Sequence, residues 1–165
     1  MIFVTVGTHE QPFDRLVKKI DDLKKNRVIT EEVIIQTGFS TYEPAQCKWK
    51  QFFSYNEMIE NINNARIVIT HGGPSSFIIS LQAGKIPVVI PRQKEFNEHV
   101  NNHQRNFCQE VANRKGNIIL VEDIEQLGNI IGNYNGIIAG MKYGHDNNNK
   151  KFCKAFEKII DEIMG

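Results

Sequence analysis

The chain has 165 residues, of which 41% are hydrophobic and 24% are charged, a composition typical of a globular protein with one domain. Its 20 basic and 19 acidic side chains leave a net charge of +1, which gives no reason to expect binding to nucleic acid or to an acidic membrane. The three cysteines are widely spaced and odd in number, so we expect free thiols rather than a zinc ribbon or a disulfide framework.

Short apolar runs alternate along the chain with longer segments of helical periodicity. The runs that predict strands lie at residues 2–6, 33–37, 49–53, 67–70, 87–91 and 118–121. The segments that predict helices lie at residues 12–25, 55–64, 75–83, 98–114, 124–131 and 150–164. In the fourth of these helices, Val100, Phe107 and Val111 are expected to face the core. The alternation predicts a Rossmann-like α/β/α sandwich with a mostly parallel sheet, as one domain over residues 1–165.

One segment does not follow this alternation, and nothing in the sequence predicts a signal peptide or a membrane span. Residues 133–149 are rich in glycine and asparagine, and we expect a polar loop, either mobile or used to dock a partner. Residues 2–6 are expected to form a strand rather than part of a signal peptide. The chain has no run of about 18 apolar residues, so we expect any membrane attachment to come through a partner.

Ligands of such sheets bind at the carboxyl ends of the strands, where three loops are expected. The first loop, residues 7–11, reads Gly-Thr-His-Glu-Gln. Gly7 allows a sharp turn, and Thr8 offers a hydroxyl beside the start of a helix, where anions are favoured. This loop matches neither GxGxxG nor a Walker motif, which argues against the usual dinucleotide and P-loop sites. An ordinary capped turn is the alternative.

The glycine loop, residues 70–76, reads Thr-His-Gly-Gly-Pro-Ser-Ser. Gly72 and Gly73 permit close approach of the backbone to a ligand, and Ser75 and Ser76 are expected as the helix cap and a first-turn hydroxyl. Together they would cradle phosphate oxygens without a cationic side chain. A plain helix cap is one alternative. The oxyanion loop of lipases is another, but it requires a GxSxG elbow, and residues 38–42 lack the second glycine.

The third loop, residues 91–104, is dense in hydrogen-bond donors and acceptors. Arg92 and Lys94 supply local positive charge. Side chains that could bracket sugar hydroxyls are Glu98, Asn102, His103 and Gln104. A solvated helix face is the alternative. His99 would share that face with a histidine four residues later, but no glutamate completes a zinc motif, so we expect no metal site.

These loops, in this order, resemble a known family. The segments that carry the resemblance are VTVGT at residues 4–8, ITHGGPSSF at 69–77, GKIPVVIPRQ at 84–93 and EHVNNHQ at 98–104. They resemble the carboxyl-terminal domain of glycosyltransferase family 28 over roughly residues 1–130. Within that family they look most like the small catalytic subunits, of PssE/EpsF type, of bacterial two-component exopolysaccharide transferases. The eukaryotic counterpart is the small subunit of the N-acetylglucosaminyl diphosphodolichol synthase.

The resemblance implies the nucleotide-sugar-binding half of a GT-B fold, a UDP-sugar donor, inverting transfer, and neither metal nor other cofactor. It implies a hexosyltransferase that moves galactose or N-acetylglucosamine to a lipid-linked saccharide in exopolysaccharide or capsule biosynthesis. Such a subunit would act with a membrane-associated, PssD-like subunit that binds the acceptor, and would lie in the cytoplasm at the inner face of the plasma membrane. The alternatives are a non-catalytic nucleotide-sugar-binding subunit and an epimerase, which would normally need both halves of the cleft in one chain.

The loops and the resemblance together predict the site residues. The substrate-binding residues are Gly7, Thr8, Ser54, Tyr55, His71, Gly72, Gly73, Ser75, Ser76, Arg92, Glu98, Asn102, His103 and Gln104. Residues 53–55 match the place where relatives hold uracil, largely through backbone. His9 is the candidate base for the acceptor hydroxyl, with Glu10 or the partner as alternatives. Single-chain relatives bind ribose through a glutamate near the position of Ile79, so that contact is expected from elsewhere.

Overall fold

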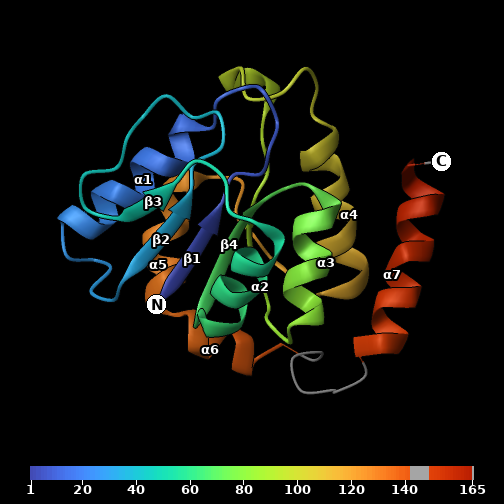
Figure 1. The fold of residues 1–165 in the computed structure, drawn as a ribbon. Helices are drawn as coiled ribbons and strands as arrows, with labels where there is room; N and C mark the ends of the chain where they lie inside the picture. The colour runs from blue at the N-terminus through green and yellow to red at the C-terminus, as the bar shows by residue number, and fades with distance from the viewer. Residues whose placement is uncertain (142–148, 165) are drawn as a thin grey trace.

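The computed structural model describes residues 1–141 and 149–164, and its core is one six-stranded, all-parallel sheet (Figure 1). The strands are β1 (Ile2–Thr5), β2 (Val33–Gln36), β3 (Lys48–Lys50), β4 (Ile67–His71), β5 (Val88–Ile90) and β6 (Ile119–Leu120). Their order across the sheet is β3-β2-β1-β4-β5-β6. This arrangement confirms the predicted Rossmann-like α/β fold.

Helices cover both faces of the sheet. The helices are α1 (Asp14–Lys25), α2 (Tyr55–Asn64), α3 (Pro74–Gln82), α4 (His103–Lys115), α5 (Leu127–Gly132), α6 (Tyr134–Ala139) and α7 (Asn149–Met164). Two short 3-10 turns are η1 (Lys94–Phe96) and η2 (Ile124–Gln126). Side chains of α1, α5 and α6 pack in one apolar cluster, whereas α2, α3 and α4 contribute to two clusters on the other face. Helix α7 lies against α3 (Figure 1).

Strand β1 shows why the sheet needs cover on both sides. Successive side chains of a strand point to opposite faces. Ile2 and Val4 accordingly pack with α1, while Phe3 packs with Ile62 of α2 and Val68 of β4. All of these side chains are buried. A central parallel strand is buried on both faces, so it is expected to have an apolar residue at successive positions. Ile2, Phe3 and Val4 of β1 show this pattern.

The third loop differs from the expected helix over 98–114. Helix α4 begins at His103, because the preceding residues form a tight turn in which the Gln93 N–H donates to the Glu98 carboxylate at 3.0 Å. Asn97 adopts the left-handed conformation there, with φ of 56°. Val100, expected in the core, is 69% exposed, whereas Phe107 and Val111 are buried as predicted.

The expectation of a polar loop over 133–149 is wrong for its first part. Residues Tyr134–Ala139 form α6, and the buried Tyr134 hydroxyl donates to the Ile86 carbonyl at 2.8 Å. Residues 142–148 lie outside the described part of the chain. The closing helix was predicted within one residue of α7, and the helix predicted over 124–131 is divided into η2 and α5. Among the described residues, no helix is long and apolar enough to cross a membrane.

The remaining differences are small and lie at element ends. The strand expected over 49–53 is β3, an exposed edge strand that ends at Lys50. Helix α1 begins at Asp14 rather than at Pro12. Helix ends fray, and local patterns define them within a residue or two.

Candidate functional site

The three loops meet at the carboxyl edge of the sheet, around the gap between β1 and β4. These strands are neighbours, yet the helices that follow them, α1 and α3, lie on opposite faces of the sheet. A sheet of this kind has its natural ligand crevice where consecutive connections diverge to opposite faces. The first loop follows β1 and the glycine loop follows β4, so the fold places both at this crevice.

His71, the last residue of β4, joins the glycine loop to the start of α3. Its Nδ1 accepts a hydrogen bond from the Gly73 N–H at 3.0 Å, and its Nε2 lies 2.9 Å from the Ser76 hydroxyl. A neutral imidazole whose Nδ1 accepts carries its proton on Nε2, so we assign Nε2–H as donor to Ser76. Burial and the charge of Arg92 lower the pKa of His71 to about 3, which keeps the ring neutral at physiological pH.

Two glycines flank this imidazole. A Cβ on Gly73 would lie 2.2 Å from Cε1 of His71, and a Cβ on Gly7 would lie 2.4 Å from its Nε2. Gly7 also has a φ of +77°, which favours glycine for a second reason. The ring of His71 therefore packs between the first loop and the glycine loop. Only residues without a side chain allow that approach.

Helix α3 begins one residue before the predicted start at Ser75. Gly73 is its N-cap and Pro74 its first residue, so Ser75 is not the cap. Ser75 is exposed and Ser76 is partly buried in the first turn. The N–H groups of a helix's first turn have no carbonyl partners within the helix, and they carry partial positive charge. Pro74 has no N–H, and the Ser76 N–H donates to the Gly73 carbonyl at 3.1 Å, so this end of α3 offers an anion the Ser75 N–H and the hydroxyls of Ser75 and Ser76.

Gln104, in the first turn of α4, ties the glycine loop to the third loop. Its side-chain oxygen accepts hydrogen bonds from the Gly72 N–H and from the Arg92 N–H, each at 3.1 Å. A Cβ on Gly72 would lie 2.9 Å from Cβ of Gln104. The structure therefore places Gln104 at the glycine loop and gives it bonds to the backbone there, whereas the sequence analysis expected it to meet a sugar.

Arg92 lies beneath the site. Its side chain is fully buried, and its guanidinium donates to the carbonyls of Val6 at 2.8 Å, Gln11 at 2.6 Å and Glu98 at 3.2 Å. Val6 directly precedes the first loop and Gln11 is its last residue, so Arg92 holds both ends of that loop from below. Burial lowers the pKa of Arg92 to about 10, yet the group remains charged at neutral pH. In this conformation Arg92 supplies positive charge without an exposed surface for a ligand.

Glu98 is likewise buried, and its side chain is bonded within the protein. It is 3% exposed, and its two oxygens pair with Arg15 of α1, Nε–Oε1 at 2.7 Å and Nη2–Oε2 at 2.9 Å. The carboxylate thereby closes the third loop onto α1 instead of facing the crevice. Asn102 accepts from the Lys94 N–H at 2.9 Å, and His103 is exposed. Of the four residues expected to meet a sugar, Glu98 is thus the least accessible.

Thr8 and Glu10 of the first loop are exposed, and His9 is partly buried between them. The His9 ring lies 4.7 Å from the His99 ring, and its Nδ1 accepts from the Gln11 N–H at 3.1 Å. Desolvation, then the charges of Arg92 and His99, lower the pKa of His9. The ring is therefore neutral, with its Nδ1 lone pair already engaged. Among the described residues, no cluster of three or more metal-ligating side chains is present.

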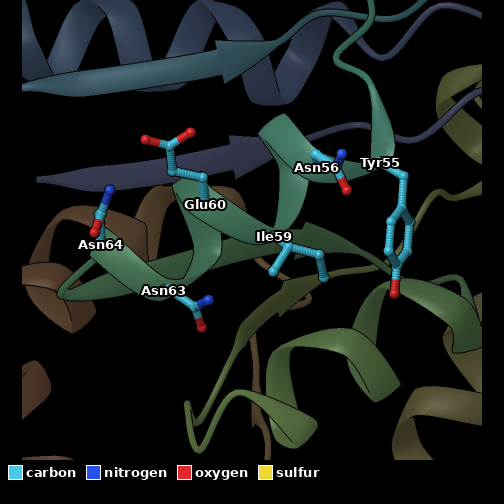
Figure 2. A pocket seen from close by; sticks show the side chains of 6 residues that line it. All are labelled: Tyr55, Asn56, Ile59, Glu60, Asn63 and Asn64. Carbon is cyan, nitrogen blue, oxygen red and sulfur yellow. The ribbon is translucent and has the colours of Figure 1, made fainter.

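Residues 53–55 lie at the start of α2, after the end of β3 at Lys50. Ser54 caps α2 in a capping box with Glu57: the Ser54 N–H donates to the Glu57 carboxylate at 2.7 Å, and the Glu57 N–H donates to the Ser54 hydroxyl at 3.3 Å. Tyr55 is 70% exposed. A hollow runs along the outer side of α2 (Figure 2). Tyr55 is the one predicted site residue that lines it, and the hollow contains no residue of the glycine loop.

Sequence reasoning missed Thr5 and Gln36, the buried last residues of β1 and β2. Their side chains bond to each other and to backbone groups of Gly7 and Phe53. The sequence did contain one indication of their role: each is a polar residue at the end of an otherwise apolar strand, at the edge of the sheet where ligands bind. Arg15, which holds Glu98, was also missed, since nothing in its helix indicates a distant partner.

Comparison with known proteins gives a family match over almost the whole chain. The family model of the glycosyltransferase family 28 C-terminal domain matches residues 1–161. Two similar curated proteins are the UDP-N-acetylglucosamine transferase subunits ALG13 of Homo sapiens, 33% identical over 112 residues, and of Mus musculus, 30% identical over 106 residues. Each match covers 59% of this chain and 9% of the relative, so the chain spans a small part of these relatives.

Among solved structures, the glycotransferase of kitacinnamycin is similar in fold. Its TM-score is 0.56 at 12% sequence identity, and the match covers 99% of this chain and 40% of that chain. At this identity the likeness concerns the fold alone. The match thus covers less than half of that structure.

Proposed function

The chain belongs to the glycosyltransferase family 28 C-terminal domain family, and we propose that it is the catalytic, donor-binding subunit of a two-subunit UDP-sugar transferase. The observation that carries the proposal is the glycine loop at the start of α3, held by His71 at the β1–β4 crevice. The names of the curated relatives support UDP-N-acetylglucosamine as donor. UDP-galactose is the second donor to test.

In this proposal the diphosphate of the donor lies at the first turn of α3. Gly72 and Gly73 would let the backbone approach it, and Ser75 and Ser76 would donate hydroxyl hydrogen bonds. As the bond from the sugar to UDP breaks, negative charge develops on the leaving diphosphate. Oriented N–H groups and hydroxyls stabilise such charge effectively because they need no reorganisation. The buried Arg92 cation adds a favourable field from below without contact.

The remaining predicted residues would surround the diphosphate. Thr8 and Gly7 would border it from the first loop, and residues 53–55 would hold uracil. The sugar end would meet Gln104, Asn102 and His103. Ile79 packs with the apolar cluster beneath α2, so the ribose contact would come from another group.

Inverting transfer needs a base that takes the proton of the acceptor hydroxyl while its oxygen attacks the sugar carbon and UDP departs. His9 remains our first candidate, since its lowered pKa keeps it neutral. Its Nδ1 is bonded to Gln11, so it would have to leave that bond to accept a proton. Glu10 and the partner subunit are the alternatives. One domain provides one wall of the cleft, and a membrane-associated subunit of PssD type, carrying the lipid-linked acceptor of exopolysaccharide synthesis, would provide the other.

A second candidate function is nucleotide-sugar binding without turnover. The observation that favours it is the engaged lone pair of His9, which leaves no histidine nitrogen of the first loop ready to accept a proton. Substitution of His9 and Glu10 in the reconstituted pair separates the two functions. Loss of transfer with donor binding retained supports the catalytic subunit, and full transfer activity supports the binding subunit or a base on the partner.

Calorimetric titration with UDP, UDP-N-acetylglucosamine and UDP-galactose, each with and without EDTA, tests the proposal. We expect saturable UDP binding that EDTA leaves unchanged, and tighter binding of the sugar nucleotide that is the substrate. The variant Ser76→Ala should bind UDP more weakly, because it loses one hydroxyl donor. If neither the folded chain nor its complex with the partner binds UDP, the proposed function is wrong.

A further inference from the structure

We propose that Gln36 is a positioning residue that sets the first loop and residues 53–55 in register for one ligand spanning both. The inference rests on the proposed function, in which these segments hold the diphosphate and the uracil of a nucleoside diphosphate. Gln36 would not touch the ligand. It would act by fixing the separation and orientation of two subsites that belong to different strands.

A chain of hydrogen bonds carries this inference. The side-chain oxygen of Gln36 accepts from the Phe53 N–H at 3.0 Å, and its Nε2 donates to the Thr5 hydroxyl oxygen at 3.1 Å. The same oxygen of Thr5 accepts from the Gly7 N–H at 3.2 Å. The bonds therefore lead from the residue before Ser54 to the first residue of the first loop, through two side chains.

The chain of bonds is buried and preformed. Gln36 is 4% exposed and Thr5 is 2% exposed, and the two residues face each other in the register of β1 and β2. The orientation of the Gln36 amide follows from its partners, because a backbone N–H requires the oxygen and a hydroxyl lone pair accepts from the nitrogen. Since both ends of the amide are satisfied without any ligand, the spacing of the two segments is established by the fold itself.

A ligand that spans two subsites depends on their relative placement, whereas a fragment that fills one does not. The second contact of a spanning ligand is intramolecular, and its benefit disappears when the geometry forbids simultaneous engagement. Uridine would fill only the subsite at residues 53–55. Inorganic pyrophosphate would fill only the subsite at the first loop and the glycine loop. UDP would fill both, so UDP alone should be sensitive to Gln36.

The test compares three ligands on three variants. Gln36→Met keeps the length of the side chain and removes both bonds, and Thr5→Val keeps the β-branched shape and removes the shared acceptor. Tyr134→Phe is the control. It removes the buried hydrogen bond from the Tyr134 hydroxyl of α6 to the Ile86 carbonyl, which lies outside the three loops. Calorimetry measures the UDP affinity, and ligand-observed NMR titration measures uridine and pyrophosphate. Thermal unfolding of each variant reports whether the domain is folded.

For both site variants we expect UDP affinity to fall about tenfold or more, the scale on which small misplacements act, while uridine and pyrophosphate bind as to the wild type. Tyr134→Phe should leave all three affinities unchanged. Equal weakening of all three ligands, or unchanged UDP affinity in a folded site variant, overturns the inference. Either site variant decides the question if the other does not fold. Absence of UDP binding by the wild type would instead overturn the proposed function.

Discussion

Replacing Gly73 by alanine tests the packing of His71 between two glycines. The backbone of Gly73, with φ of −78° and ψ of 134°, suits any residue, so the effect of the substitution comes only from the added Cβ. That atom would lie 2.2 Å from Cε1 and 2.9 Å from Nδ1 of His71. On its other side the buried ring packs closely against Gly7, near enough that a Cβ on Gly7 would lie 2.4 Å from Nε2, so the ring has little room to move away from Gly73. Alanine must therefore displace the ring or the glycine loop.

The cost can be worked from the interactions that displacement breaks. Forcing a methyl group into a well-packed interior costs about 1–3 kcal/mol. The displaced ring also loses its bonds to the Gly73 N–H and to the Ser76 hydroxyl, each worth about 0.5–1.5 kcal/mol. We expect the free energy of unfolding to fall by about 2–6 kcal/mol. UDP affinity should fall as well, because the first turn of α3 moves.

Urea unfolding and UDP titration of Gly73→Ala, beside Gly136→Ala, measure both effects. Gly136 is exposed within α6, and a Cβ there meets nothing within 4 Å. The control substitution should raise the free energy of unfolding by about 0.5–1 kcal/mol, since alanine is the better helix former. If Gly73→Ala keeps the wild-type stability and the wild-type UDP affinity, His71 does not pack as described and the site must be built differently.

Three further predictions follow from the buried and exposed members of the site. Arg92→Met leaves three backbone carbonyls without their donor, so urea unfolding should show a loss of about 3 kcal/mol or more, at about 1–3 kcal/mol for each unsatisfied acceptor; unchanged stability would contradict this role of Arg92. His71 has a folded pKa of about 3 against its ordinary 6.5, so between these values acid protonates this imidazole only in the unfolded chain. The contribution of His71 to stability should therefore be constant above pH 6.5 and fall by about 1.4 kcal/mol per pH unit from there down to the folded pKa, and His71→Gln should remove this part of the slope between pH 6 and 5. Ser75 is exposed, so Ser75→Ala should weaken UDP binding in calorimetry without lowering the melting temperature; a matching loss of stability would show a structural role instead.

The architecture was predictable because the local patterns agree with one another. Apolar strands that need cover on both faces alternate with amphipathic helices, and this combination leads to a parallel sheet with helices on each side. The short α6 was not predictable in the same way. Its glycine and asparagine residues are poor helix formers, and the helix is held by tertiary contact, with Tyr134 buried and bonded to Ile86.

The error at Val100 has a similar origin. The spacing from Val100 to Phe107 and Val111 fits one face of a helix, so the local pattern alone extends α4 to residue 98. In the structure α4 begins only at His103. The segment before it is held in a turn by Glu98, whose carboxylate accepts from the Gln93 N–H and pairs with Arg15 of α1. Arg15 is distant in the sequence, and a reading of periodicity within one segment contains no information about such a partner.

The same limit applies to the candidate site. Gly72 and Gly73 lie at the carboxyl edge of the sheet, where two glycines before a helix are expected from the local backbone alone, while the bonds of Gln104 to this loop depend on a contact between distant segments. The binding roles of these residues stay predictions. Arg92 and Gln104 belong to the same polar loop, and a sequence does not say which of them faces the crevice. Burial decides it: a cation that donates to three carbonyls beneath the first loop cannot also present its donors to a ligand. The loops that would hold the donor therefore stand on a second, buried layer of Arg92, His71 and Gln36. Substitutions in that layer should cost stability and binding together, whereas substitutions of the exposed hydroxyls should cost binding alone.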